Sequence, residues 1–345
     1  MRLGVLDVGS NTVHLLVVDA HRGAHPTPMS SEKNALRLSE RIGQTGTLDA
    51  DGADELVRSV DSARRHALDA GCQELMAFAT SAIRDADNSH EVLDRVHAET
   101  GVELRVLSGR DEARLTFLAA RRWYGWSAGR LLLVDIGGGS LEMAIGVDED
   151  PDMAVSLPLG AGRLSRTVRE DPPSPDELKD LRKRLDDGLS DVAKRFRKQG
   201  KPDKVVATSK TLRTLARLTG AAPNSAGQRV SRSLTDTGLR QLLAFITRMS
   251  AEDLATVDGV SSARSHQLVA GALVADATMR ALSLRELDIC PWALREGIIL
   301  RRLDHANGED QKAPNGGGEH TVVGEPPQPD QGTGRKAQYG ARWNR

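Results

Sequence analysis

The sequence has very little cysteine. Only two cysteines occur among 345 residues, Cys72 and Cys290, and they lie far apart in the chain. Two such thiols provide neither a disulfide framework nor the paired spacing of a zinc site, and they suit a reducing compartment. The sequence therefore excludes the small disulfide-rich and zinc-stabilised classes, and we expect a cytoplasmic protein.

Long apolar runs and an excess of one charge are also missing. No run approaches the roughly 18 apolar residues that a membrane span needs, and no basic segment typical of a signal peptide precedes the first apolar stretch. The formal net charge is −1, so no overall field favours nucleic acid or a membrane surface as a partner. At this length, with 39% hydrophobic and 28% charged residues, the chain can form two soluble domains.

What the sequence does contain is a glycine turn between two apolar stretches. Residues 131–142 read Leu-Leu-Leu-Val-Asp-Ile-Gly-Gly-Gly-Ser-Leu-Glu, which predicts a buried strand, a tight turn and a returning strand. Glycines let a ligand approach the backbone, and successive bare N–H groups form an anion site. Asp135 ends the first strand, where a carboxylate beside phosphates needs a metal cation between them. The alternative is an ordinary glycine-rich hairpin.

A second copy of this pattern favours the functional interpretation. Asp7-Val8-Gly9-Ser10 lines up with Asp135-Ile136-Gly137-Gly138, 128 positions later (135 − 7), and each copy lies between apolar strands. Two copies of one phosphate-binding hairpin predict a duplicated α/β domain with a cleft between the halves. We expect domains at 1–124 and 125–306, with a helix at 292–304 as a candidate to complete the first. Residues 307–345 have the composition of a disordered tail.

Three more segments place polar residues after predicted strands. Arg84 follows a strand at 74–79 and is either a phosphate clamp or a surface arginine. Glu112 lies in the first turn of a helix capped by Ser108, where it either orients a water or simply favours the helix N-terminus. Lys210 follows a short strand and is either a phosphate contact or a surface cation.

Six motifs in order give the sequence a resemblance to the Ppx/GppA family over about residues 1–305. This is the exopolyphosphatase and guanosine pentaphosphate phosphatase group of the actin, sugar kinase and Hsp70 superfamily. The resemblance implies an α/β fold of two similar actin-like (ribonuclease H-like) domains with a cleft between them. The motifs are Asp7-Val8-Gly9-Ser10-Asn11, Ala79-Thr80-Ser81-Ala82-Ile83-Arg84, Ser108-Gly109-Arg110-Asp111-Glu112-Ala113-Arg114, Asp135-Ile136-Gly137-Gly138-Gly139-Ser140-Leu141-Glu142, Leu157-Pro158-Leu159-Gly160 and Arg295-Glu296-Gly297.

The resemblance also implies roles for the candidate residues. Glu112 would position or deprotonate the attacking water, Arg84 would clamp phosphate, and Asp135 would act with the metal. Mg²⁺ or Mn²⁺ would lie among Asp7, Asp135 and Glu142. Together with Lys210, the groups expected to bind the substrate phosphates are Ser10, Asn11, Thr12, Gly137, Gly138, Gly139 and Ser140.

The implied activity is exopolyphosphatase: a metal-assisted water releases orthophosphate from the end of inorganic polyphosphate. Hydrolysis of pppGpp, the alarmone of the stringent response, is the alternative. A polyphosphate/ADP phosphotransferase and an alarmone-binding sensor are further ones. Relatives are often dimers, so the resemblance implies a homodimer.

Four departures from the family pattern stand out. Thr12 replaces a serine and keeps its hydroxyl. Ser209-Lys210-Thr211 stands where relatives often carry Gly-Gly-Thr, and a lysine there would narrow an adenosine pocket, which favours a phosphate chain over a nucleotide. Arg264-Ser265 replaces an Arg-Asp pair, and we have no account of its effect. Residues 307–345 contain no helical domain of the His-Asp type, so we expect short polyphosphates as the substrate.

Overall fold

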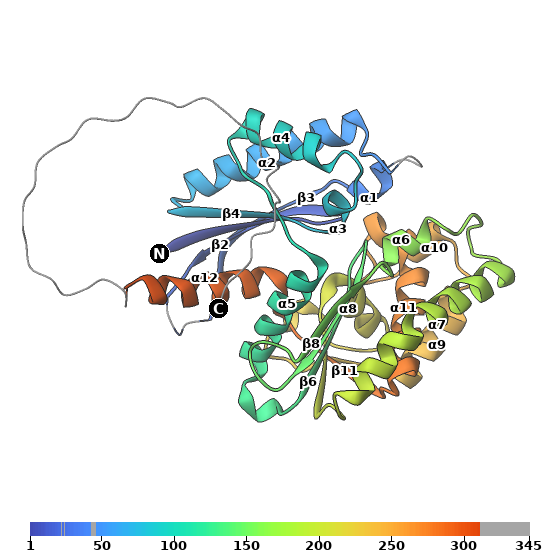
Figure 1. Cartoon of the computed structure of the whole chain (residues 1–345). Helices are drawn as coiled ribbons and strands as arrows, with labels where there is room; N and C mark the ends of the chain where they lie inside the picture. Colours follow the sequence, from blue (N-terminus) through green and yellow to red (C-terminus); the bar gives the residue numbers. More distant parts are fainter. Residues whose placement is uncertain (22, 24, 43–45, 311–345) are drawn as a thin grey trace, which may run out of the picture.

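The structure, a computed structural model, describes residues 1–310 except 22, 24 and 43–45 (Figure 1). The first half is built on a sheet with the strand order β3-β2-β1-β4-β5. The first three strands are antiparallel, and β4 and β5 continue parallel to β1. These strands are β1 (Arg2–Val8), β2 (Thr12–Asp19), β3 (Pro28–Ala35), β4 (Glu74–Ala79) and β5 (Arg105–Val106).

The second half repeats this sheet. Its order is β10-β11-β9-β6-β7-β8, so β8-β7-β6-β9-β11 reproduces the order and the strand directions of the first sheet, with β10 added at the edge. The strands are β6 (Leu131–Ile136), β7 (Leu141–Gly146), β8 (Met153–Leu157), β9 (Lys204–Ala207), β10 (Ser233–Thr235) and β11 (Glu286–Ile289). The duplication expected from the two hairpins is therefore confirmed at the level of sheet topology.

Helices cover both faces of both sheets. Beside the first sheet lie α1 (Leu38–Arg41), α2 (Ala50–Asp69), α3 (Ser81–Arg84), α4 (Ser89–Thr100) and, from the C-terminal end, α12 (Leu294–Asp310). Beside the second sheet lie α5 (Gly109–Tyr124), α6 (Ala161–Ser165), α7 (Pro175–Lys198), α8 (Ser209–Leu218), α9 (Asp236–Ile246), α10 (Ala251–Ala255) and α11 (Leu268–Leu282). Among the described residues no helix is long and apolar enough to cross a membrane.

The alternation of side chains along the central strands explains this layering. Successive residues of a strand face opposite sides of its sheet. In β6, Leu131 and Leu133 pack with α5, whereas Leu132 and Val134 pack with α7 and α11. In β1, Leu3 and Val5 share a cluster with Ile298 and Ile299 of α12, and the other face packs on α2. Figure 1 shows α12 and α2 on opposite faces of the first sheet.

One predicted helix start is confirmed, and one helix end differs. Ser108 caps α5 by accepting a hydrogen bond from the N–H of Asp111, and Ser174 with Glu177 forms the capping box of α7. The helix expected at 292–304 begins at Leu294 and continues to Asp310, so it overlaps the start of the tail expected from 307. The remainder of that tail, residues 311–345, lies outside the described residues. The domain bounds 1–124 and 125–306 remain a prediction.

Candidate functional site

The two hairpin turns lie against each other where the halves of the molecule meet. They are built alike: the N–H of Gly9 donates to the carbonyl of Thr12, and the N–H of Gly137 donates to the carbonyl of Ser140, both at 2.9 Å. A methyl group on Gly138 would lie 2.6 Å from Nδ2 of Asn11 and 2.9 Å from Cβ of Ser10. Glycine at this position is therefore required for the close approach of the second turn to the first.

Most of the amides expected to bind phosphate are available in the turns. No backbone hydrogen bond within the described chain uses the N–H groups of Ser10, Asn11, Gly138, Gly139 or Ser140. Gly137 is an exception, because its N–H closes the turn; that Gly137 binds phosphate remains a prediction. Thr12 begins β2, and its carbonyl closes the first turn.

The predicted acids gather beside these turns. Asp7 and Asp135 occupy equivalent places, each one residue before the end of β1 or β6. Glu142 lies opposite Asp135 in the register between β6 and β7. Its Oε1 accepts a hydrogen bond of 2.7 Å from Oγ of Ser156, and the hydroxyl of Thr208 donates to Asp135. The sequence reasoning missed Ser156 and Thr208; the place of Thr208 after β9, equivalent to Thr80 after β4, was the available signal.

Glu112 and Arg84 face the same group of acids. Nη1 of Arg84 donates to Oε2 of Glu112 at 3.3 Å and to the carbonyl of Leu107 at 3.1 Å. The side chain of Glu112 is 16% exposed and that of Arg84 is 21% exposed. The structure thus brings together the residues that the sequence placed after β4 and β5, although they are 28 positions apart (112 − 84).

Burial and mutual repulsion change the ionisation of the acids. Burial raises the pKa of Glu112 well above its ordinary value, Glu142 raises it further, and Arg84 opposes the rise. Burial and the charge of Asp135 raise the pKa of Glu142 to about 7. The pKa of Asp135 and that of Asp7 are also raised, in each case first by burial. A cation among these groups would favour their charged forms.

The donor chemistry of Asp7, Asp135 and Glu142 suits a hard divalent cation, which prefers carboxylate oxygens. In the part of the chain that the structure describes, however, no three His, Cys, Asp or Glu side chains are close enough together to hold a metal ion as they stand. The three acids fit such an ion by type and location, and Mg²⁺ commonly completes its coordination with water and substrate phosphate oxygens.

A cluster of five cations lies next to the acids, and only Lys210 of them was predicted to bind phosphate. Beyond burial, the charges of Arg264, Lys210, Arg295 and Arg213 lower the pKa of Lys33. Nε of Arg213 and Nε of Arg295 are buried and have no hydrogen-bond partner among the described residues. The members of this basic cluster are Lys33 of β3, Lys210 and Arg213 of α8, Arg264 of the 3-10 helix Ser262–Gln267 and Arg295 of α12.

Ser209, which precedes Lys210, has a backbone conformation that is typical of glycine. Ser209 has φ of 72°, in the left-handed region that favours glycine. The main chain thus has a conformation typical of glycine, while Lys210 adds a long basic side chain beside it. The lysine lines a small cavity with Arg264 and Gln267.

Gln267 links the basic side of the site to the first turn, and sequence reasoning missed it. Its Nε2 donates to Oδ1 of Asn11 at 2.9 Å, and Nδ2 of Asn11 donates to Oε1 of Gln267 at 3.3 Å. Both side chains are buried. This reciprocal pair holds Asn11 in place across 256 positions of sequence; no local pattern indicated it.

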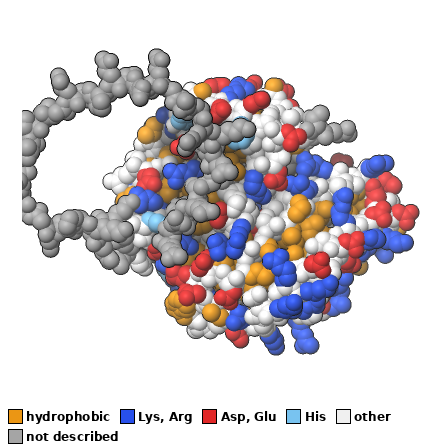
Figure 2. Space-filling model, in the orientation of Figure 1, with side chains coloured by type: hydrophobic (Ala, Val, Ile, Leu, Met, Phe, Trp, Pro, Cys, Tyr) orange, Lys and Arg blue, Asp and Glu red, His pale blue; other side chains and the backbone are white. Residues whose placement is uncertain are grey.

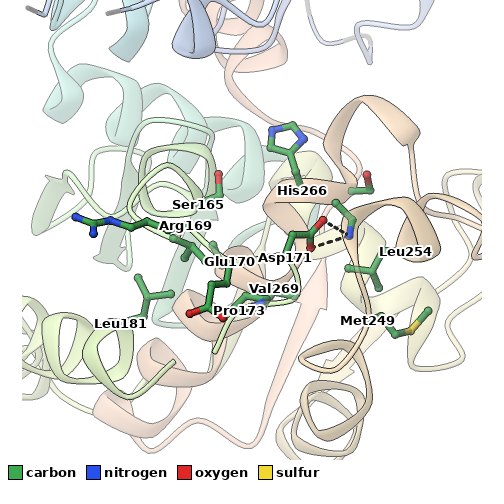
Figure 3. A pocket seen from close by; sticks show the side chains of 14 residues that line it. Ser165, Arg169, Glu170, Asp171, Pro173, Leu181, Met249, Leu254, His266 and Val269 are labelled. Atoms are coloured by element: carbon green, nitrogen blue, oxygen red, sulfur yellow. Dashed lines mark hydrogen bonds between the residues drawn. The ribbon is translucent and has the colours of Figure 1, made fainter. Parts of the chain in front are cut away.

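The larger of the two described cavities does not contain the acids. It measures about 190 Å³ and lies in the second half between the segment 165–173 and the helices α10 and α11 (Figure 3). Leu181, Met249, Leu254 and Val269 form much of its wall, and Asp171 is occupied in accepting from the N–H of Ala251. Since none of the predicted site residues lines it, we do not place the active site there.

Charged side chains of both signs are mixed on the surface of the molecule. Figure 2 shows Lys and Arg side chains interspersed with Asp and Glu over the visible face. The basic cluster is therefore a local feature, not part of a uniformly basic surface.

Comparisons with known proteins identify relatives along most of the chain. The family profile described as "Ppx/GppA phosphatase family" matches residues 17–306. A protein named exopolyphosphatase 1 from Mycobacterium tuberculosis (strain ATCC 25618 / H37Rv) is 63% identical over 305 residues, which cover 88% of this chain and 89% of that protein. Its namesake from Mycobacterium leprae (strain TN) is 62% identical over 305 residues, covering 88% and 90%.

Solved structures agree with these relatives. A Ppx/GppA family member from Aquifex aeolicus has a TM-score of 0.74 at 25% identity, covering 89% of this chain and 99% of that one. A structure described as an exopolyphosphatase from Cytophaga hutchinsonii has a TM-score of 0.80 at 23% identity, covering 88% and 98%, and supports the fold. The expected fold of two similar actin-like domains is confirmed. The chain belongs to the Ppx/GppA phosphatase family.

Proposed function

We propose that this protein is an exopolyphosphatase, a hydrolase that cuts the terminal phosphoanhydride bond of inorganic polyphosphate and releases orthophosphate. The relatives at 62–63% identity bear that name. The observation that carries the proposal is the contact between the two hairpin turns, with Glu112 and Arg84 beside the acids of both strands.

In the proposed reaction the chain's own groups hold the terminal phosphate and prepare one water. Free amides of the two turns donate to the phosphoryl oxygens, and Arg84 balances their charge. Glu112 accepts the proton of the attacking water. Mg²⁺ or Mn²⁺, held by Asp7, Asp135 and Glu142, would neutralise charge on the phosphates when bound.

The basic cluster supports a phosphate chain as substrate. A polyphosphate has an anionic group at every unit, so cations from several elements can bind successive phosphates. Arg213 and Arg295 have unpaired buried Nε groups that an anion would satisfy. A nucleoside would place an uncharged base and sugar against Lys33, Lys210 and Arg264. These groups would not balance the positive charge of the three side chains. We therefore propose polyphosphate in preference to pppGpp, and the preference for short chains stays an expectation from the sequence.

An orthophosphate-release assay tests the function. We expect release from short polyphosphate in the presence of Mg²⁺, less from long polyphosphate, and little from pppGpp or ATP. Faster release from pppGpp would favour the alarmone phosphatase instead. Formation of ATP from polyphosphate and ADP would favour a phosphotransferase, and tight pppGpp binding without any release would favour a sensor.

Lys210→Met should weaken substrate binding. A charged hydrogen bond contributes about 1.5–3 kcal/mol, so we expect KM for short polyphosphate to rise about tenfold or more. The turnover number should change little, because Lys210 lies outside the group of acids. Steady-state kinetics measure both. Lys201→Met, which removes an exposed lysine of the same half, is the control; equal KM values for the two variants would remove Lys210 from the substrate site.

Asp135→Asn should raise the Mg²⁺ requirement. The amide retains the size of the carboxylate and a possible bond to Thr208, but it loses the negative charge that attracts the cation. We expect the Mg²⁺ concentration for half-maximal activity to increase by about tenfold or more, as for the loss of about 1.4 kcal/mol of binding. A titration of activity against Mg²⁺ measures this change, and an unchanged midpoint would exclude Asp135 from the metal site.

Location and assembly are part of the same proposal. We propose a cytoplasmic protein, because Cys72 and Cys290 are free thiols. We propose a homodimer by analogy with the family, which the molar mass from light scattering will test.

A further inference from the structure

The glycine turn is held from behind by α6. The N–H of Ala161 donates to the carbonyl of Gly137 at 2.9 Å, and the N–H of Arg163 donates to that of Gly138 at 2.8 Å. Nε of Arg163 donates to the carbonyl of Gly139 at 2.9 Å. Each of the three glycine carbonyls therefore has a donor on one short helix.

These bonds set the direction of the amides in the turn. A trans peptide is planar, so a carbonyl and the N–H of the following residue point in opposite directions. The bond from Arg163 to the Gly139 carbonyl consequently directs the N–H of Ser140. In the same way, the bond to the Gly137 carbonyl directs the N–H of Gly138, and the bond to the Gly138 carbonyl directs the N–H of Gly139.

The guanidinium group of Arg163 also contacts the first half of the molecule. Its Nη2 pairs with the carboxylate of Asp85. Asp85 directly follows α3, and its Oδ1 accepts from Nε of Arg84 at 3.2 Å. Arg84 in turn donates to Glu112. One connected path thus runs from the glycine turn through Arg163, Asp85 and Arg84 to Glu112.

We propose that Arg163 and Asp85 are positioning residues that hold the amide of Ser140 and the guanidinium of Arg84 in register across the two halves. The proposal rests on the proposed function, since it concerns the same phosphate site. In this proposal both residues act without touching the phosphoryl group. Arg163 acts through the glycine turn. Asp85 acts through Arg84, because it accepts a hydrogen bond from Nε of Arg84 while Glu112 accepts one from Nη1.

The pair is suited to a positioning role because it contributes little to stability. The side chains of Arg163 and Asp85 are 34% and 36% exposed. Ion pairs at this exposure contribute about 0–1 kcal/mol to folding. Variants at these positions should therefore fold, and a change in their kinetics reports on the geometry of the site.

The test compares Arg163→Met with Arg217→Met. Arg217 is a matched control, because it also donates to a carbonyl and to a carboxylate, at 37% exposure, but in the last turn of α8, at the end away from Lys210. We expect Arg163→Met to lower kcat for short polyphosphate by about 10- to 100-fold, as for a catalytic group displaced by about 1 Å. KM should stay within a factor of about three, because the basic cluster binds the other phosphates of the chain, and Arg217→Met should behave as the parent.

A double variant tests whether the two residues act through one link. We expect Asp85→Asn to lower kcat. The double variant Arg163→Met with Asp85→Asn should have the same kcat as the less active of the two single variants, because either change alone already breaks the path. Multiplicative losses, or a kcat within twofold of the parent for Arg163→Met, would overturn the proposal.

A binding measurement separates this inference from the proposed function. Orthophosphate should raise the thermal midpoint of the parent and of Arg217→Met, and raise that of Arg163→Met less, whether or not polyphosphate is hydrolysed. An equal rise in all three proteins would overturn the positioning role. Absence of phosphate release from the parent, with the difference in orthophosphate binding retained, would instead overturn the exopolyphosphatase activity alone.

Discussion

Glu112→Gln should reduce phosphate release by about 10²- to 10⁴-fold, the usual contribution of a general base. Glutamine has nearly the same shape and can still accept a bond from Nη1 of Arg84, but it cannot take a proton from water. The raised pKa of Glu112 reflects burial and the charge of Glu142, so a neutral side chain at this position also removes repulsion. We therefore expect the loss in kcat without a loss of folding stability.

Glu99→Gln provides the matched control for this change. Glu99 accepts from Nε of Arg95 at 2.7 Å on the exposed surface of α4, away from the turns. Its replacement should leave kcat unchanged. If Glu112→Gln retained the kcat of Glu99→Gln in the same assay, the water-activating role of Glu112 would be wrong.

Gly297→Ala should cause the largest loss of stability. Gly297 lies where α12 crosses α5, and a methyl group there would overlap the carbonyl oxygen of Leu115. The clash is between backbone and backbone, so no side chain can move to relieve it. We expect the free energy of unfolding to fall by about 3 kcal/mol, the upper end for overpacked interiors.

The same substitution should also reduce activity, because the two helices carry the site. Glu112 lies in the first turn of α5, and Arg295 of α12 is bonded to His14 beside Asp7. Gly188→Ala is the control: in α7 the added methyl would contact only the flexible end of Leu159, at 3.3 Å. That change should alter stability by about 1 kcal/mol or less. Urea unfolding of the three proteins measures the difference, and equal midpoints would show that the crossing tolerates the added methyl.

The sequence predicted the local parts of the site well. Each hairpin is a contiguous stretch in which apolar strand residues flank a glycine turn, so neighbouring residues alone indicate it. The same is true of Ser108, which caps the helix that carries Glu112. The duplication was visible because the two copies share Asp-x-Gly in equivalent places, and the sheet orders confirm it.

Long-range contacts were not predictable in this way. Lys33, Arg264 and Arg295 come from distant parts of the chain, and nothing in the residues around each of them indicates that the three side chains meet. Only the packing of β3, the 3-10 helix Ser262–Gln267 and α12 around α8 brings them close to Lys210. The bond of Arg163 to the glycine turn, and its pairing with Asp85, likewise have no local signature.

The amino-acid sequence by itself determined the two turns, the acids at the ends of β1 and β6, and membership of the family. These features depend on glycine stereochemistry and on the alternation of apolar residues, which act over a few positions. Tertiary structure decided that the turns meet, that Glu112 reaches the acids of both halves, and which cations surround them. The reason is that these distances depend on how two separate cores pack, and on the close crossing of α5 and α12 at Gly297.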